Sequence, residues 1–257
     1  MIDTFNGVAM FTLIKREMVR SLKIINQVIW PPVITTVLYV TIFGLALGSR
    51  IKTVQGVSYA EFLIPGLIML QVIDSSYGEC SSSVFQGRFM NSIQEMLIAP
   101  MSAAEMIFGY IFGSVARALV IANIIMVLGF FFVHTFPSNW LLYFGVMIEV
   151  SILFSALGII FGLMAEKFDH IAILTTFAIT PLVFVGGVFT SAQLLPPQLR
   201  NWELVNPMFY TVDAFRYSYT AHSYLPLWLS VGAITVLAAI ALSVALRMAA
   251  VGYKLRT

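Results

Sequence analysis

The chain has 257 residues, of which 60% are hydrophobic and only 10% are charged, and its mean hydropathy is +0.93. Soluble domains usually carry about 25% charged residues, so this composition indicates a membrane protein and excludes a disordered chain. The net charge of +2 comes from 14 basic and 12 acidic residues spread along the chain, which excludes a nucleic-acid binder. A single cysteine, Cys80, excludes an internal disulfide framework.

Long segments without any charged residue cover residues 24–49, 118–148, 171–199 and 217–246. Since roughly 20 apolar residues cross a bilayer, each of them is long enough to form a transmembrane helix. The hydropathy of the whole chain predicts an all-α membrane protein with six spans, approximately at residues 28–48, 60–83, 104–133, 139–165, 171–191 and 225–247.

Lysine and arginine residues indicate the orientation, because cytoplasmic loops retain them. If the N-terminus is inside, the inner segments hold Lys15, Arg16, Arg20, Lys23, Arg88, Lys167, Arg247, Lys254 and Arg256. The outer segments hold Arg50, Lys52, Arg200 and Arg216. We therefore expect both termini in the cytoplasm. A cleavable signal peptide is not expected, because the charges of the first 23 residues follow the apolar residues instead of preceding them.

The N-terminal region, residues 1–26, is expected to contain an interfacial helix at residues 5–23. One side of its helical wheel carries Val8, Phe11, Ile14, Met18 and Leu22, and the opposite side carries Arg16, Arg20 and Lys23. Such a helix lies in the headgroup plane of the inner leaflet. The alternative is a basic flank that only sets the topology. Trp30, Pro31 and Pro32 are expected to mark the start of the first span.

The cytosolic loop at residues 84–103 is predicted to hold a short amphipathic helix over residues 85–98. Its apolar side consists of Phe89, Ile93, Met96 and Leu97, and its polar side of Arg88, Asn91 and Glu95. After Pro100, Ser102 and Glu105 have the S-x-x-E spacing of a capping box at the start of the third span. The residues leave open whether this helix rests on the membrane or docks a partner.

The outer region at residues 192–224 is too long for a turn and too apolar for a solvated domain. Asn206 before Pro207 predicts a helix start, so we expect two re-entrant half-helices before the last span. Asp213 and Arg216 are three residues apart and are expected to pair. The aromatic residues favour an interfacial belt, although they also suit a lipidic or sugar cargo: Phe189, Trp202, Phe209, Tyr210, Phe215, Tyr217 and Tyr219.

Apart from residues at the very ends of the predicted spans, four charged residues lie inside them, where a charge needs a partner or water: Asp74, Glu79, Arg117 and Glu149. Asp74 and Arg117 lie roughly 21 Å and 24 Å from the outer ends of their spans, so we expect them to pair. Glu149 is expected to face a wetter outer cavity, and Glu79 to snorkel towards the inner interface. Whether these residues act in transport or only in packing is open.

Glycine spacing favours a packed bundle. Gly109 with Gly113, and Gly158 with Gly162, have the G-x-x-x-G spacing that lets helices approach closely. Gly186 and Gly187 follow Pro181 by five and six residues, which predicts a kinked or broken fifth span.

Motifs for catalysis, metal binding and ATP binding are missing from the sequence. The three histidines, His134, His170 and His222, are scattered, and there is no H-E-x-x-H or cysteine pair, so no metal site is expected. A G-x-S-x-G elbow does not occur, and none of the five lysines follows a glycine as a P-loop requires. The chain is therefore not expected to be an enzyme.

Four segments follow one another in a recognisable order. They are the basic amphipathic start leading to Trp30-Pro31-Pro32, Phe62-Leu63-Ile64-Pro65-Gly66-Leu67, Glu95-Met96-Leu97-Ile98-Ala99-Pro100-Met101-Ser102, and Asn206-Pro207-Met208-Phe209-Tyr210. Together they resemble the membrane permeases of ABC type-2 exporters. With Arg216, the last one looks like the family signature P-x-x-[HRSY]-x5-[RQ], which would make Pro207, Tyr210, Asp213 and Arg216 part of an outer re-entrant motif.

The resemblance implies a permease of the bacterial inner membrane that exports a lipid, a polysaccharide or an amphipathic drug-like compound. It implies a homodimer or close heterodimer with two separately encoded ATPase subunits, which would carry ATP and magnesium, so this chain itself has no cofactor. The ATPase contacts would be Arg16, Arg20, Arg88, Phe89, Ile93, Glu95 and Met96. The alternative is an ion-coupled secondary transporter that uses Asp74, Glu79, Arg117 and Glu149 as a relay. An intramembrane enzyme is disfavoured.

Overall fold

Helices form almost all of the regular structure, because a chain in a bilayer must satisfy its backbone hydrogen bonds within each segment. The computed structural model describes residues 6–46, 48, 53–54, 56–90, 93, 101–194 and 196–254. The longer helices are α1 (Gly7–Lys23), α2 (Ile25–Ala46), α3 (Tyr59–Phe89), α5 (Ala103–Val133), α6 (Trp140–Met164), α10 (Pro207–Thr220) and α11 (Leu227–Val251). The shorter elements are β1 (Thr53–Val54), β2 (Val57–Ser58), α7 (Phe168–Leu174), η1 (Thr175–Ile179), α8 (Thr180–Val183), η2 (Phe184–Val188), η3 (Ala192–Leu194) and α9 (Pro197–Val205).

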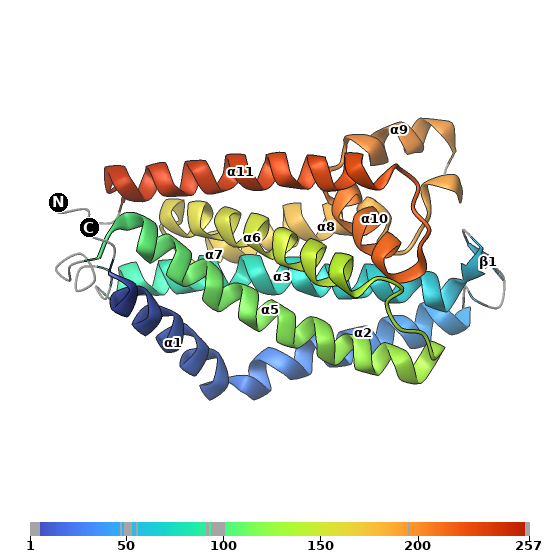
Figure 1. Ribbon diagram of the computed structural model, residues 1–257, viewed down its shortest axis with the longest axis horizontal. Coiled ribbons are helices and arrows are strands. Elements are labelled where there is room, and N and C mark those ends of the chain that lie inside the picture. Colours follow the sequence, from blue (N-terminus) through green and yellow to red (C-terminus); the bar gives the residue numbers. More distant parts are fainter. Residues whose placement is uncertain are drawn as a thin grey trace.

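The long helices run side by side along the longest axis of the molecule (Figure 1). Helix α3 lies in the middle of the bundle, where it packs against α2, α5 and α6, and its side chains Phe62, Leu67 and Ile73 are fully buried. The start of α1 and the end of α11 lie at one end of the bundle, and the β1–β2 hairpin and α9 lie at the other (Figure 1). We call these the α1 end and the α9 end.

Five helical segments are long and apolar enough to cross a membrane, namely α2, α5, α6, α11 and the run from Phe168 to Val188. They agree with five of the six predicted spans. The other predicted span, residues 60–83, lies in α3, which carries Asp74 and Glu79 and continues to Phe89. The prediction of a separate helix that begins at residue 85 was therefore wrong. The helix continues because this stretch has no proline and Gly87 packs against Ile93.

The start of the first span also differs from the prediction. Helix α2 begins at Ile25, so Pro31 and Pro32 lie inside the helix and not in its first turn. The carbonyl oxygen of Ile24 accepts hydrogen bonds from the amides of Gln27 and Val28 at 2.8 and 3.1 Å. These hydrogen bonds start the helix before the prolines. Gln27 and Val28 can donate them because they have a backbone N–H, which proline lacks.

The fifth predicted span is broken at Gly186 and Gly187, as expected from these glycines. Gly187 has a φ of +88°, a conformation that side-chain-bearing residues rarely adopt, and two π-helical segments flank α8. In α6, a methyl group on Gly158 would lie 2.6 Å from the carbonyl oxygen of Tyr77, and one on Gly162 would lie 2.8 Å from that of Ser81. The second G-x-x-x-G pair therefore brings the backbones of α3 and α6 into direct contact.

Candidate functional site

Helix α1 packs on the bundle through a third face, which is neither the apolar nor the basic side of its helical wheel. The side chains of Leu13 and Glu17 are buried, at 5% and 3% exposure, and they fill the space over Gly109 and Gly113 of α5. A methyl group on either glycine would lie within 2.8 Å of these side chains. The first G-x-x-x-G pair thus receives α1. The apolar stripe of α1 remains exposed at Val8, Phe11, Met18 and Leu22, as expected of an interfacial helix.

Glu17 is a site residue that the sequence analysis missed. Its carboxylate forms ion pairs with Arg16 at 2.9 Å and Arg20 at 3.1 Å, and it accepts a hydrogen bond from the hydroxyl of Ser83 at 2.8 Å. The signal was present, because Glu17 is the only acidic residue of α1 and shares a wheel sector with Leu13. A buried carboxylate requires such partners.

Glu79 lies at the point where α1, α3 and α5 meet. Its carboxylate forms ion pairs with Arg20 at 2.5 Å and with Arg117, and it accepts a hydrogen bond from the hydroxyl of Ser21 at 3.1 Å. Glu79 is 5% exposed, so the expectation that it snorkels was wrong. Arg20 reaches into the bundle from α1 and neutralises it there.

Arg117 pairs with Glu79, whereas we had expected it to pair with Asp74. Among the described residues Asp74 forms no ion pair and is exposed, although Arg117 still attracts it electrostatically. Five residues separate Asp74 from Glu79, which corresponds to roughly 140° of rotation on a helix. Depth in the membrane alone could not distinguish these two carboxylates.

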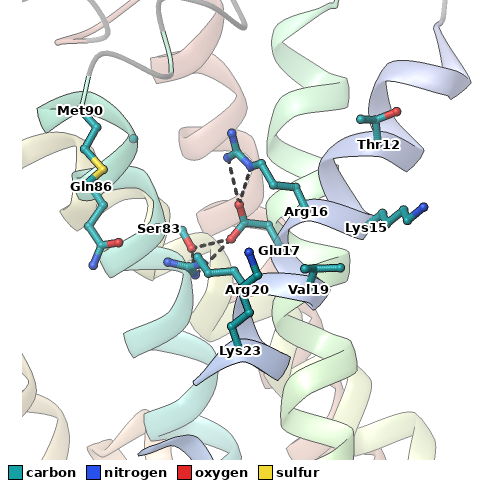
Figure 2. A pocket seen from close by; sticks show the side chains of 11 residues that line it. Thr12, Lys15, Arg16, Glu17, Val19, Arg20, Lys23, Ser83, Gln86 and Met90 are labelled. Carbon is teal, nitrogen blue, oxygen red and sulfur yellow. Dashed lines mark hydrogen bonds and ion pairs between the residues drawn. The ribbon is translucent and has the colours of Figure 1, made fainter. Parts of the chain in front are cut away.

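The ion pairs border a cavity of about 500 Å³ between α1 and the end of α3 (Figure 2). Figure 2 shows the side chains of Arg16 and Arg20 converging on Glu17, next to Ser83. The expected contact residues Arg16 and Arg20 are thus brought together at the α1 end, where they also hold α1 on the bundle.

Arg88 has a structural role that the helical stripe did not predict. Its Nη1 atom donates to the carbonyl oxygens of Gly162, Leu163 and Ala165 at 3.1, 2.8 and 2.9 Å. These are unpaired carbonyls at the C-terminal end of α6, where a cation is also favoured by the helix dipole. Arg88 therefore fastens the end of α6 to α3.

The predicted apolar stripe at residues 85–98 divides between two environments. Phe89 is 79% exposed, whereas Ile93 is 1% exposed and packs on Gly87. Glu95 and Met96 lie outside the described residues. The capping box at Ser102 and Glu105 is confirmed, with both reciprocal hydrogen bonds present.

At the α9 end, the predicted helix start at Asn206 and Pro207 is confirmed. The side chain of Asn206 accepts a hydrogen bond from the amide of Met208 at 3.0 Å and donates to the carbonyl oxygen of Leu182 at 2.6 Å. The hydroxyl of Tyr210 donates to the carbonyl oxygen of Leu204 at 2.8 Å, which ties α10 to α9. Most of the aromatic residues that we expected in an interfacial belt do not form one. Phe189, Phe209, Phe215 and Tyr219 are buried, whereas Trp202 is exposed.

Asp213 and Arg216 attract each other but form no direct ion pair, because each is hydrogen-bonded to another neighbour. The carboxylate of Asp213 accepts hydrogen bonds from the amides of Tyr224 and Leu225 at 2.7 and 3.1 Å. Arg216 donates to the carbonyl oxygen of Gly187 at 2.7 Å and lies 3.7 Å above the centre of the Phe62 ring. The signature arginine thus joins α10 to the broken fifth span and to the start of α3.

The remaining predicted charges form no direct ion pair with these clusters. Glu149 is half-buried and accepts a hydrogen bond from the hydroxyl of Thr235 on α11. Asp74 is at the middle of α3 and borders a cavity of about 200 Å³, together with Pro31, Pro32, Thr35, Gln71 and Thr180. The four intramembrane residues do not form one chain, as a relay of protons or ions would require.

Glu203 in α9, outside the five candidate spans, is fully buried, and no described group donates a hydrogen bond to either of its carboxylate oxygens. Burial raises the pKa of Glu203 to about 7, and the carboxylate of Asp213 acts in the same direction. The guanidinium groups of Arg216 and Arg200 act against this shift. Glu203 is therefore able to hold a proton near neutral pH.

Comparison with known proteins identifies the family. Residues 8–220 match the profile of the ABC-2 type transporter family. The chain belongs to this family. It is 38% identical over 229 residues to the inner membrane transport permease YadH of Escherichia coli K12, a match that covers 89% of this chain and 90% of YadH. Nodulation protein J of Neorhizobium galegae is 21% identical over 198 residues, which are 77% of this chain and 76% of that protein.

Membership in the ABC-2 type transporter family, together with the apolar helices, makes the chain a multi-pass protein of the inner membrane. It is the membrane component of a transporter and not itself the ATPase. The ABC-2 match covers α1 through α10, so it includes both the ion-pair cluster of the α1 end and the arginine motif of the α9 end.

A double-mutant cycle tests the pair between Glu79 and Arg117. We expect Glu79→Gln to destabilise the protein in detergent by about 3 kcal/mol, because Arg117 loses its ion-pair partner. Arg117→Gln should cost less, because Glu79 keeps its ion pair with Arg20. The double variant should lose at least about 1 kcal/mol less than the sum of both. The same cycle with Asp74→Asn in place of Glu79→Gln is the control and should show a smaller coupling, because Asp74 forms no direct ion pair with Arg117. A stronger coupling to Asp74 than to Glu79 would contradict the assignment.

The pH dependence of stability tests Glu203. The folded chain holds a proton on Glu203 up to about pH 7, whereas an unfolded glutamate releases it at about pH 4.3. The free energy of unfolding should therefore fall as the pH rises from 5 to 8, by at most about 1.4 kcal/mol per pH unit. In Glu203→Gln this fall should be smaller, and in the exposed control Glu166→Gln it should be as in the wild type. An equally steep profile in Glu203→Gln would refute the assignment.

Proposed function

We propose that the chain forms the membrane conduit of an ATP-driven exporter, together with a second copy or a close homologue. A separately encoded ATPase would bind ATP and magnesium and would dock from the cytosol. The conduit would have six spans in each chain, with α3 as the sixth, since its 31 residues extend over roughly 46 Å and so exceed the bilayer core.

The distribution of charge supports an orientation with both termini in the cytoplasm. The α1 end carries Lys15, Arg16, Arg20, Lys23, Arg88, Lys167, Arg247 and Lys254. Of the described basic residues, Arg200 and Arg216 lie at the α9 end. This asymmetry is the one that cytoplasmic and outer segments show.

The exposure of Asp74 is the observation that carries the proposal of a paired conduit. Asp74 is the sixteenth of 31 residues in α3 and is exposed on the surface of the single chain. A carboxylate at the middle of a span does not face lipid, so this surface requires either a protein partner or water. A second copy placed against α2, α3 and α8 would enclose Asp74 and the cavity beside it in a path between the two chains.

An aromatic patch at the α1 end is the proposed docking surface for the ATPase. Phe89 and Met90 are exposed, the rings of Phe85 and Phe89 are stacked at 6.4 Å, and Phe168 contacts Phe85 at 5.9 Å. Phe89 and the half-exposed Arg16 are the contacts that suit a partner. Arg88 and the buried Ile93 would instead pass a displacement on to α6 and α5.

Helices α9 and α10 are the proposed re-entrant pair at the outer boundary. Trp202 and Val205 of α9 are exposed, at 73% and 78%, as expected of a segment that touches the outer leaflet. The cargo would be a lipid, a polysaccharide or an amphipathic drug-like compound that moves outward between the two chains.

Cross-linking in membranes tests the paired conduit. In a Cys80→Ala background, Asp74→Cys should give a covalent dimer with a short bis-maleimide, because both copies would bring this position to their interface. Ile240→Cys, which is 57% exposed on α11 in the single chain, is the lipid-facing control and should stay monomeric. Dimers at Ile240→Cys alone, or at neither position, would overturn the proposed arrangement.

Purification in mild detergent tests the separate ATPase. We expect an ATP-hydrolysing partner to copurify with the wild type, and Phe89→Asp to lose it, because a charge would disrupt an apolar contact. Val251→Asp is the control, since Val251 is 77% exposed at the same end but on α11. Transport that runs on a proton gradient without any copurifying ATPase would establish the secondary-transporter alternative instead.

A further inference from the structure

The cavity between α1 and the end of α3 has features that the proposed docking of an ATPase does not explain. It measures about 500 Å³, which is the size of a typical small-molecule site. Its lining residues are Thr12, Lys15, Arg16, Glu17, Val19, Arg20, Lys23, Ser83, Gln86, Gly87 and Met90. One wall is therefore a basic face of α1, and the opposite wall presents a hydroxyl and an amide from α3.

Positive charge exceeds negative charge around this cavity. Three arginines, Arg16, Arg20 and Arg117, share the two carboxylates of Glu17 and Glu79. Lys23 adds a further charge, and within the described part of the chain it forms no ion pair. In Figure 2 Lys23 extends towards Arg20, whereas Lys15 points away. An excess of cations beside a partly desolvated cluster is stabilised by an anion.

Hydrogen-bond donors are also left over. The Nε atom of Arg20 is buried, and no described group accepts its hydrogen. Arg20 otherwise directs one terminal nitrogen at Glu17, Glu79 and Ser83. Arginine forks, an ammonium and an amide are the donors that recognise the oxygens of a phosphate, which offers several acceptors in a compact group.

The position of the cavity on α1 indicates where such a phosphate lies. With 100° of rotation per residue, the basic sector of Arg16, Arg20 and Lys23 lies between the buried sector of Leu13 and Glu17 and the exposed apolar stripe. A helix that buries such a stripe in the membrane surface places the flanking basic residues at the depth of the lipid phosphates.

We propose that the cavity between α1 and α3 binds a phosphate group, carried by the headgroup of an anionic phospholipid or by a free phosphate compound. Bound there, the phosphate bridges Lys23 and Arg20 of α1 to Gln86 of α3. The inference uses the proposed orientation only to place the cavity at the inner leaflet.

Thermal unfolding of the purified full chain in an uncharged detergent tests this site. The probes are dihexanoyl phosphatidylglycerol, dihexanoyl phosphatidylcholine and inorganic phosphate. We expect phosphatidylglycerol to raise the midpoint in a saturable way and phosphatidylcholine to leave it unchanged. Protection by inorganic phosphate at equal concentration supports the site and assigns it to free phosphate compounds, whereas protection by phosphatidylglycerol alone assigns it to lipid.

Two variants and a control locate the effect. Lys23→Gln should weaken the apparent affinity for the protecting anion by roughly tenfold, because a charged hydrogen bond is lost. Gln86→Leu, on the opposite wall, should weaken it without changing the net charge. Arg247→Gln removes an exposed charge from α11 and should leave it unchanged. Equal weakening by Lys23→Gln and Arg247→Gln, or equal protection by phosphatidylcholine, would overturn the inference. Neither readout involves an ATPase or a dimer, so it is independent of the proposed function.

Discussion

The buried carboxylate of Glu79 is the constraint on which the assembly of the α1 end depends. At the junction of three helices it is stable only if cations reach it, and Arg20 and Arg117 do so from two different helices. Arg20 can reach it only when α1 lies against α3 and α5, which Leu13 and Gly109 allow at close range. The position of α1 on the bundle is therefore set by charge inside the bundle as well as by close packing on α5.

The α9 end has an equivalent arrangement built on an arginine. Arg216 is 2% exposed, and it satisfies a carbonyl oxygen that the break at Gly187 leaves free. Its guanidinium also lies over the ring of Phe62 at the start of α3. Helix α3 is thus held on both sides of its middle by arginines from other helices, at Phe62 and at Glu79, while Asp74 at its middle remains exposed. This contrast separates the residues that build the bundle from the one that a second copy would cover.

Side-chain capping signals in the sequence were reliable, and signals that depend on rotation about a helix were not. The spacing of Ser102 and Glu105, and the order of Asn206 and Pro207, predicted helix starts because capping involves only neighbours. The partner of Arg117 could not be predicted, since hydropathy gives the depth of a residue and not the side of the helix that it occupies. Glu17 was missed because dividing the helical wheel of α1 into an apolar and a basic side leaves out the face that packs on the bundle.

The contact between α3 and α6 has a mechanical consequence. At Gly158 and Gly162 the two backbones touch without a side-chain layer between them, and Arg88 ties the end of α6 to α3. Helices α3 and α6 should therefore tilt together as one rigid unit. A displacement applied at Phe89 would therefore be transmitted along α3 to Phe62. The guanidinium that lies over the Phe62 ring is that of Arg216, which belongs to α10 at the opposite end of the bundle.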